Sequence, residues 1–217
     1  QTRFFAFYSI AIFATICIAY SGNLLTLFIF YEVLTFSTYP LVAHKQDKKA
    51  KSAGRIYMGI LVGTSVVFLL PAIIIVWVLT GSLDFAPNGV LKGYISKEYV
   101  PLLLALFAFG IGKAALMPFH KWLPAAMVAP TPVSALLHAV AVVKAGVFSM
   151  LVIITYVFGI DFLTETQGSV WLIWLSSITL LLSSCIAITK NDLKARLAYS
   201  TISQLSYIVL GGAIATN

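Results

Sequence analysis

GKAALMPFHKWLPAAMVAPTPVSALLHAVAVVKAGVF, residues 112–148, is the stretch that decides the fold. Its second half belongs to an apolar run, residues 133–157, that is long enough to cross a bilayer as a helix. Yet Lys144 lies at the middle of this run and His138 near its start. An ionisable side chain at mid-membrane depth costs about 2.5–3.5 kcal/mol on an insertion scale, and by default it marks an ion or proton pathway or a buried counter-ion. The sequence therefore predicts a polar site inside a membrane protein.

The first half of the stretch predicts an interrupted helix. Pro118 has no backbone N–H and its ring crowds the carbonyl of Ala114, so we expect the helix that carries Lys113 to break or kink one turn beyond the lysine. Residues 119–127 are too short to span a membrane alone, and they fit either an interfacial helix or the second half of one discontinuous crossing. Broken helices at membrane depth commonly mark transport sites. An ordinary proline kink without an ion role is the alternative.

The composition extends this membrane assignment to the whole chain. Of the 217 residues, 60% are hydrophobic and only 10% are charged, whereas soluble proteins have about 25% charged residues. We expect an all-α integral membrane protein with about seven transmembrane helices. The predicted crossings are residues 4–20, 24–43, 56–80, 100–117, 133–157, 169–189 and 193–214.

The net charge of +7 follows the same arrangement. If the first crossing starts inside, ten basic residues fall on one face of the membrane and two on the other, as the positive-inside rule describes. The ten are Arg3, Lys45, Lys48, Lys49, Lys51, Arg55, Lys121, Lys190, Lys194 and Arg196. Lys92 and Lys97 lie opposite, while Lys113 and Lys144 fall within crossings. The charge therefore indicates membrane topology, with a cytoplasmic N-terminal end, and no nucleic-acid partner.

The sequence gives no sign of a cofactor, a metal site or a catalytic residue. Cys17 and Cys185 lie inside apolar crossings, without a CxxC motif or histidines spaced for zinc. There is no glycine-rich phosphate loop. The chain lacks an initiator methionine and ends just after a helix, so we expect it to be part of a longer protein.

Four titratable residues in three crossings suggest a proton pathway: Glu32, Lys113, His138 and Lys144. We expect Glu32 to pair with Lys113, while Lys144 loads or releases a proton according to whether that pair is closed, and His138 serves as an intermediate. The alternatives are a static ion pair that fixes helix register and a histidine that is merely hydrogen-bonded in the interior.

Four further residues are possible accessories to this pathway. Ser203 and Gln204 belong to a polar stripe on the last helix that either packs helices together or holds water. Lys194 opens the same helix on the basic side, as a topological anchor or an accessory of the path, and His120 either lines the inner mouth of a path or faces lipid headgroups.

Several of these motifs together carry a resemblance to a known family. They are PFHKWLP at residues 118–124, APTPVSALLH at 129–138, VKAG at 143–146, NLL at 23–25, YE at 31–32 and DLKARLAYSTISQL at 192–205. The chain resembles the antiporter-like membrane subunits shared by respiratory complex I and the Mrp-type multisubunit sodium/proton antiporters. FYEVLT at 30–35, GRIYMGIL at 54–61 and HAVAVVK at 138–144 look most like the MrpD subunit of these antiporters.

The resemblance implies a core of two inverted five-helix repeats, each with a broken helix, here the segment from Lys113 to Pro118. Residues 1–157 would form the first repeat and residues 158–217 the first two helices of the second. It implies a proton-conducting subunit of a monovalent cation/proton antiporter in a bacterial inner membrane, with other hydrophobic subunits as partners and protons and sodium as the ions. A proton-pumping subunit of complex I or of a membrane-bound hydrogenase is the alternative, and a seven-helix receptor is suggested by helix count alone.

Overall fold

The structure is a computed structural model that describes residues 2–216, apart from the side chains of residues 139 and 140. The described chain is built from helices. The longer α-helices are α1 Thr2–Ala19, α2 Leu24–Val42, α3 Lys48–Thr64, α4 Leu70–Thr80, α5 Val100–Gly110, α8 Val142–Val152, α10 Val170–Thr189 and α11 Leu193–Ile214. The short ones are α6 Trp122–Ala125, α7 Thr131–Ala135 and α9 Ile160–Thr166. Three π-helical turns continue neighbouring helices, namely η1 Ser65–Leu69, η6 Leu136–Val140 and η7 Ile153–Phe158.

Six helical runs of the described chain are long and apolar enough to cross a membrane. They are Thr2–Ala19, Leu24–Val42, Lys48–Thr80, Thr131–Phe158, Val170–Thr189 and Leu193–Ile214. These runs confirm six of the seven crossings predicted from the sequence. The expected crossing at residues 100–117 is the exception, because α5 has only 11 residues before its helix ends.

Polar side chains at the helix starts explain where two of these runs begin. The side chain of Asn23 accepts a hydrogen bond from the backbone N–H of Thr26 at 2.7 Å, and Asp47 accepts one from Ala50 at 2.6 Å. Each bond satisfies an N–H group that has no partner within its helix. Short polar connections thus turn the chain back on itself and place α1, α2 and α3 next to one another.

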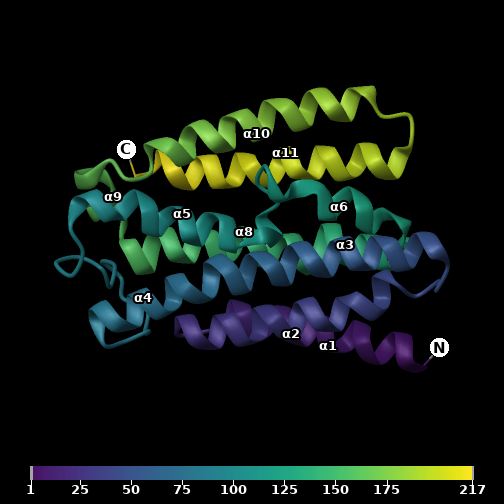
Figure 1. Cartoon of the computed structure of the whole chain (residues 1–217), viewed down its shortest axis with the longest axis horizontal. Coiled ribbons are helices and arrows are strands. Elements are labelled where there is room, and N and C mark those ends of the chain that lie inside the picture. Colours follow the sequence, from purple (N-terminus) through teal and green to yellow (C-terminus); the bar gives the residue numbers. More distant parts are fainter. Residues whose placement is uncertain (1, 217) are drawn as a thin grey trace.

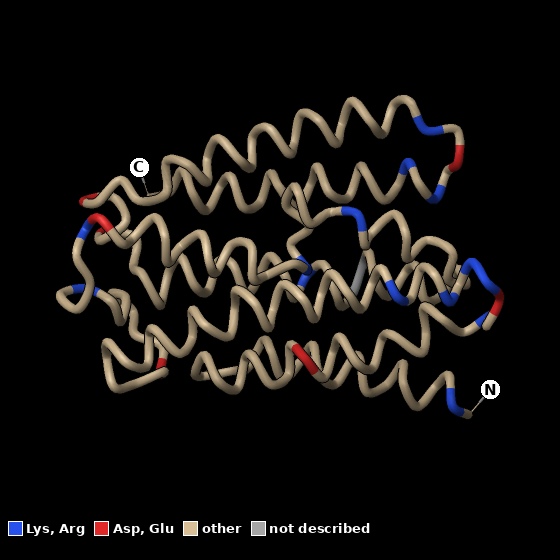
Figure 2. The backbone as a smooth tube through the Cα atoms, in the orientation of Figure 1, with Lys and Arg blue, Asp and Glu red and all other residues tan. Residues whose placement is uncertain are grey.

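The helices form an elongated bundle with α8 near its middle (Figure 1). The α1–α2 pair lies along one side and the α10–α11 pair along the other. α8 contacts α1, α2, α11 and the turn Gly112–Ala114. Most lysines and arginines gather at the end of the bundle that holds the N-terminus and the α2–α3 and α10–α11 connections (Figure 2). This gathering agrees with the predicted asymmetry of charge.

The helix of α5 ends earlier than the sequence predicted. It stops at Gly110, so Lys113 lies inside the break, in the 3-10 turn Gly112–Ala114, and no helix carries it up to Pro118. The reason is local, because two glycines three residues and one residue before the lysine favour the end of a helix. These glycines also let the chain approach its neighbours: a Cβ on Gly110 would lie 2.5 Å from the Leu69 nitrogen, and one on Gly112 would overlap the Thr64 hydroxyl oxygen.

Gly146 of α8 makes the second close approach to this break. A Cβ at this position would overlap the carbonyl carbon of Lys113 and lie 2.5 Å from the nitrogen of Ala114. Real Cβ atoms do not come so near to backbone. The absence of a side chain at Gly146 therefore allows α8 to pack directly on the backbone of the broken segment.

Replacement of Gly146 by alanine should destabilise the protein. The new methyl group must push α8 away from the Lys113 backbone, at a cost of about 1–3 kcal/mol, which outweighs the helix propensity gained. We expect a lower midpoint of thermal unfolding for the full-length G146A protein in detergent. Gly63→Ala on α3 is the matched control, since a Cβ there meets nothing within 4 Å, and its midpoint should stay the same or rise. Equal midpoints for the two variants would contradict the close approach.

Candidate functional site

Lys113 is the centre of the candidate site because its charged side chain is fully buried in the bundle. Its exposed fraction is 0%. The ammonium donates hydrogen bonds to the carbonyl oxygen of Tyr31 at 2.8 Å and to the hydroxyl oxygen of Thr35 at 2.7 Å. It also lies 3.0 Å from the centroid of the Tyr31 ring, which is a cation–π contact. The ammonium is thus held by neutral groups of α2, which we call the Lys113 cradle: Tyr31 and Thr35.

Tyr31 contacts both the backbone and the ammonium of Lys113. While its ring and carbonyl receive the ammonium, its phenolic oxygen accepts a hydrogen bond of 3.1 Å from the backbone N–H of Lys113. This N–H lies in the helix break, where it lacks the partner that a continuous α-helix would supply. One side chain therefore fixes both the backbone and the charge of Lys113.

The buried side chain of Trp122 satisfies another backbone group of the broken segment. The indole N–H of Trp122 donates to the carbonyl of Gly112 at 2.9 Å. The Tyr57 ring of α3 packs edge-on against Trp122 with centroids 5.6 Å apart, and its hydroxyl lies 2.6 Å from that of Thr38. The freed backbone of the broken segment is thus satisfied by protein, as a break at membrane depth requires.

Glu32 does not pair with Lys113 in this structure. Within residues 2–216 the one ion pair joins Lys92 to Glu165 at 3.6 Å, near the molecular surface. The two carboxylate oxygens of Glu32 are buried, and neither has a hydrogen-bond partner among the described residues. The pairing fails because the ammonium has turned to Tyr31 and Thr35, whereas Glu32 lies about 100° further round α2 from Tyr31.

His138 connects the helix after the break to α11. It lies in the π-helical turn η6, and its Nδ1 atom is 3.2 Å from the hydroxyl oxygen of Thr201. Because the Thr201 hydroxyl donates to the carbonyl of Leu197 at 2.8 Å, its oxygen is left to accept a bond from Nδ1–H. The Nε2 atom is buried and has no partner within the described part of the chain. In the neutral tautomer this nitrogen is a free proton acceptor.

Lys144 is exposed in the described chain and faces away from Lys113. Gly146 faces the Lys113 backbone, and a residue two positions earlier lies about 200° round an α-helix. The two lysines therefore lie on opposite sides of α8. The sequence placed Lys144 inside a crossing, further along the pathway from Lys113, and the structure leaves its side chain exposed in the described chain.

The structure gives three of the accessory residues, Lys194, Ser203 and Gln204, different surroundings. The Lys194 ammonium donates to the carbonyl of Ala129 at 3.0 Å, just before α7, so this lysine joins α11 to the segment that leads to His138. Ser203 is buried, and its hydroxyl lies 2.7 Å from that of Ser184 on α10, which is a packing contact between helices. Gln204 is exposed.

His120 and Pro118 lie at the far end of the break. The Nδ1 atom of His120 is buried without a hydrogen-bond partner among the described residues, and its ring lies 6.2 Å from that of Tyr199. Pro118 precedes the 3-10 turn Phe119–Lys121, so it lies within the interrupted segment but does not start it.

Sequence reasoning missed Tyr31 and Trp122. A signal for Tyr31 existed, because it lies one helical turn before Thr35 and thus shares its face, while Glu32 does not share that face as closely. No comparable signal marked Trp122. Among residues 2–216, no group of three or more His, Cys, Asp or Glu side chains is placed to hold a metal ion.

Comparisons with known proteins agree with the membrane fold. Residues 21–217 match the family described as NADH:quinone oxidoreductase/Mrp antiporter, TM. A putative antiporter subunit mnhA2 of Staphylococcus haemolyticus is 33% identical over 98% of this chain and 27% of its own length. The NAD(P)H-quinone oxidoreductase chain 5 of a Synechocystis strain is 34% identical over 98% of this chain and 31% of its own length. The chain therefore spans about a third or less of each of these relatives.

Two solved structures have the same fold. A chain of the Mrp complex from a Dietzia strain matches 99% of this chain and 23% of its own length, with a TM-score of 0.85 and 27% identity. A chain of an archaeal membrane-bound sulfane sulfur reductase matches 92% and 41%, with a TM-score of 0.80 and 27% identity. These comparisons correct one expectation, since the similar relatives named above are an antiporter subunit mnhA2 and a quinone oxidoreductase chain 5, whereas the sequence motifs pointed to MrpD.

The cradle can be tested by a double-mutant cycle between Thr35 and Lys113. Thr35→Val should lower the unfolding free energy of the full-length protein by about 1–3 kcal/mol, because a buried ammonium loses an acceptor. In a Lys113→Met background the same change should cost less than about 0.5 kcal/mol. The measurement is unfolding by detergent titration.

Thr15→Val is the matched control for this cycle. The hydroxyl of Thr15 donates to the carbonyl of Ala11 within its own helix, at 2.8 Å. Its effect should therefore be the same with and without Lys113. A cost of Thr35→Val that is equally large in both backgrounds would mean that the cradle does not hold the charge.

Proposed function

The chain belongs to the NADH:quinone oxidoreductase/Mrp antiporter transmembrane family, and on this premise we propose that it forms part of the proton-conducting subunit of a multisubunit monovalent cation/proton antiporter. The observation that carries the proposal is the fully buried Lys113, which lies in a helix break with neutral partners only, beside an unpaired Glu32. Burial of a charge inside a membrane costs free energy, and a charge in such a position by default marks an ion or proton pathway.

In this proposal Lys113 has two positions. In one, seen in the structure, the ammonium rests on Tyr31 and Thr35. In the other it turns to the carboxylate of Glu32 on the same helix. An ammonium beside a carboxylate holds its proton more strongly than one that is surrounded by neutral groups. Movement between the two positions therefore takes up and releases a proton.

His138 and Lys144 continue the proposed pathway beyond the break. The free Nε2 atom of His138 takes a proton while Nδ1–H remains bound to Thr201. Lys144 lies on the other side of α8 from the cradle, so we place it one step further along the line. An ammonium halfway along a membrane-crossing helix needs water or a polar group beside it. We propose that segments outside this chain supply that group in the whole subunit.

The finer architecture is also part of the proposal. Residues 1–157 form the first of two inverted five-helix repeats, and residues 158–217 begin the second. The basic end of the bundle faces the cytoplasm of a bacterial inner membrane. Other hydrophobic subunits complete the complex, and sodium is the ion exchanged for protons. The name of the Staphylococcus relative and the fold of the Mrp chain support this version.

Removal of the buried charges should slow proton transport. We expect Lys113→Met, Glu32→Gln and Lys144→Met, each made in the full-length subunit within its complex, to reduce proton uptake into vesicles at least tenfold. Each variant removes a group that carries or stabilises the transferred proton. The measurement is the change in fluorescence of a pH-sensitive dye enclosed in proteoliposomes after a sodium gradient is applied.

Lys97→Met is the matched control for transport. It removes the same charge from an exposed position in the connection before α5, and uptake should stay within twofold of the unchanged protein. The proposal fails if Lys113→Met and Glu32→Gln complexes assemble normally and transport protons at the control rate.

A second candidate is a subunit of a redox-driven membrane complex. It is favoured by the relative named NAD(P)H-quinone oxidoreductase chain 5 and by the structural match to a sulfane sulfur reductase chain. The same buried residues would then move protons in response to redox chemistry in other subunits.

Purification of the native complex separates the two candidates. For an antiporter we expect an affinity-tagged full-length subunit to carry only other membrane subunits, with no flavin absorbance and no iron–sulfur signal. Mass spectrometry of the partners together with optical and paramagnetic resonance spectra is the measurement. Stoichiometric flavin or iron–sulfur clusters would favour the redox complex instead.

A further inference from the structure

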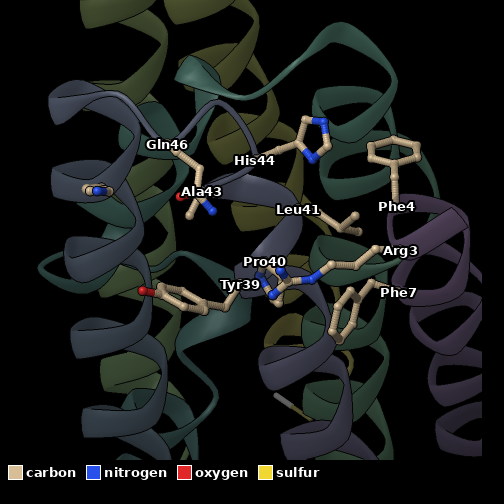
Figure 3. Close-up of a pocket in the computed structure, with 10 residues that line it drawn as sticks. Arg3, Phe4, Phe7, Tyr39, Pro40, Leu41, Ala43, His44 and Gln46 are labelled. Carbon is tan, nitrogen blue, oxygen red and sulfur yellow. The ribbon is translucent and has the colours of Figure 1, made fainter. Parts of the chain in front are cut away.

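A cavity of about 320 Å³ lies at the basic end of the bundle, between the start of α1 and the end of α2. Figure 3 shows the Arg3 side chain reaching from α1 toward Pro40 of α2, with His44 beside the Phe4 ring. Lys51, from the first turn of α3, also lines the cavity. Three cationic or ionisable nitrogen groups from three segments therefore surround one space.

No acid of the described chain forms an ion pair with these groups. The guanidinium of Arg3 lies 5.8 Å from the centroid of the Phe7 ring, which orients it, and its N–H donors have no hydrogen-bond acceptor among residues 2–216. The nearest acid along the chain, Asp47, uses its carboxylate to cap α3 at Ala50. Lys45, Lys48 and Lys49 add further positive charge in the same connection. The cavity thus fits an anion.

A second cavity continues the first on its apolar side. It has a volume of about 370 Å³, is lined by Phe4, Phe5, His44 and Pro130, and shares Phe4 and His44 with the basic cavity. Phe5 is 63% exposed on α1, whose outer surface is apolar along its length. A ligand that fills both spaces has an anionic head and an apolar tail.

We propose that these two cavities bind one anionic phospholipid. Its phosphate lies between Arg3 and Lys51, and the first part of an acyl chain runs past Phe4 and Phe5. Arginine suits this task because its planar group donates two parallel bonds to phosphate oxygens. Basic pockets between membrane-crossing helices on the cytoplasmic side are recognised sites for anionic headgroups. A cavity of 320 Å³ is within the usual range of ligand pockets, about 300–1,000 Å³.

The site differs from the Lys113 cradle in place and chemistry. Its residues lie where two candidate membrane spans end, at the start of α1 and the end of α2, while the cradle is buried in the bundle interior. The two are joined by α2, because Tyr39 and Pro40 line the cavity, and Thr35 and Tyr31 lie about one and two turns earlier on the same helix. The bound lipid would hold α1 against the end of α2.

The proposal is tested by lipid binding to the full-length subunit in detergent, measured by native mass spectrometry. The probes are dioleoylphosphatidylglycerol and dioleoylphosphatidylcholine, and the variant is Arg3→Gln combined with Lys51→Gln. We expect phosphatidylglycerol to bind the double variant about 30-fold more weakly than the unchanged protein, since two basic groups are lost. Phosphatidylcholine should bind weakly and equally to both.

Lys92→Gln combined with Lys97→Gln is the matched control, because it removes two positive charges from the segment between α4 and α5, which lies at the end of the bundle opposite the N-terminus (Figure 1). Its phosphatidylglycerol affinity should be unchanged. Lys51→Gln alone, at an exposed position, should give about a fivefold loss and serves if the double variant does not fold.

Three results would overturn the proposal. In the first, the Arg3/Lys51 variant binds phosphatidylglycerol as tightly as the unchanged protein, which would also be the case if another segment of the subunit filled the cavities. In the second, the control loses as much affinity, which would mean general charge attraction. In the third, millimolar inorganic phosphate displaces the lipid completely, which would mean a phosphate site without a lipid.

Discussion

The burial of one ammonium group, that of Lys113, is the constraint on which the rest of the structure depends. A lysine with 0% exposure needs hydrogen-bond acceptors in an interior that offers few. α5 must end so that the lysine can turn aside, α2 must present a carbonyl, a hydroxyl and an aromatic ring, and α8 must lack a side chain where it passes. The break, the cradle and Gly146 thus form a single arrangement.

The sequence predicted the elements of this arrangement better than their relation to one another. The crossings followed from the length of apolar runs, because the bilayer thickness fixes that length. The position of the break followed from Pro118 only approximately, since the helix ends at Gly110, where it packs tightly against Leu69. Local chemistry can show that a helix is interrupted. The residue at which it stops depends on which neighbour lies against it.

In the candidate site, too, the sequence predicted several of the residues but not the directions of their side chains. Glu32, Lys113 and His138 could be selected because ionisable residues are rare in apolar crossings. That Lys113 turns to Tyr31 and not to Glu32 depends on a difference of one residue, about 100°, round α2. The direction of Lys144 depends in the same way on the face that Gly146 presents to the break. The side of a helix that faces a given neighbour is set by tertiary packing. These helices are apolar on nearly all sides, so the periodicity of their sequence does not show which side that is.

The placement of Lys113 and Lys144 on opposite sides of α8 has an electrostatic consequence. The charge of Lys113 is stabilised inside the bundle, by the carbonyl and ring of Tyr31 and the hydroxyl of Thr35. Lys144 is exposed on the other side of α8, so its charge must be stabilised by whatever surrounds the bundle. α8 thus separates a lysine that the fold itself solvates from one whose charge depends on its surroundings.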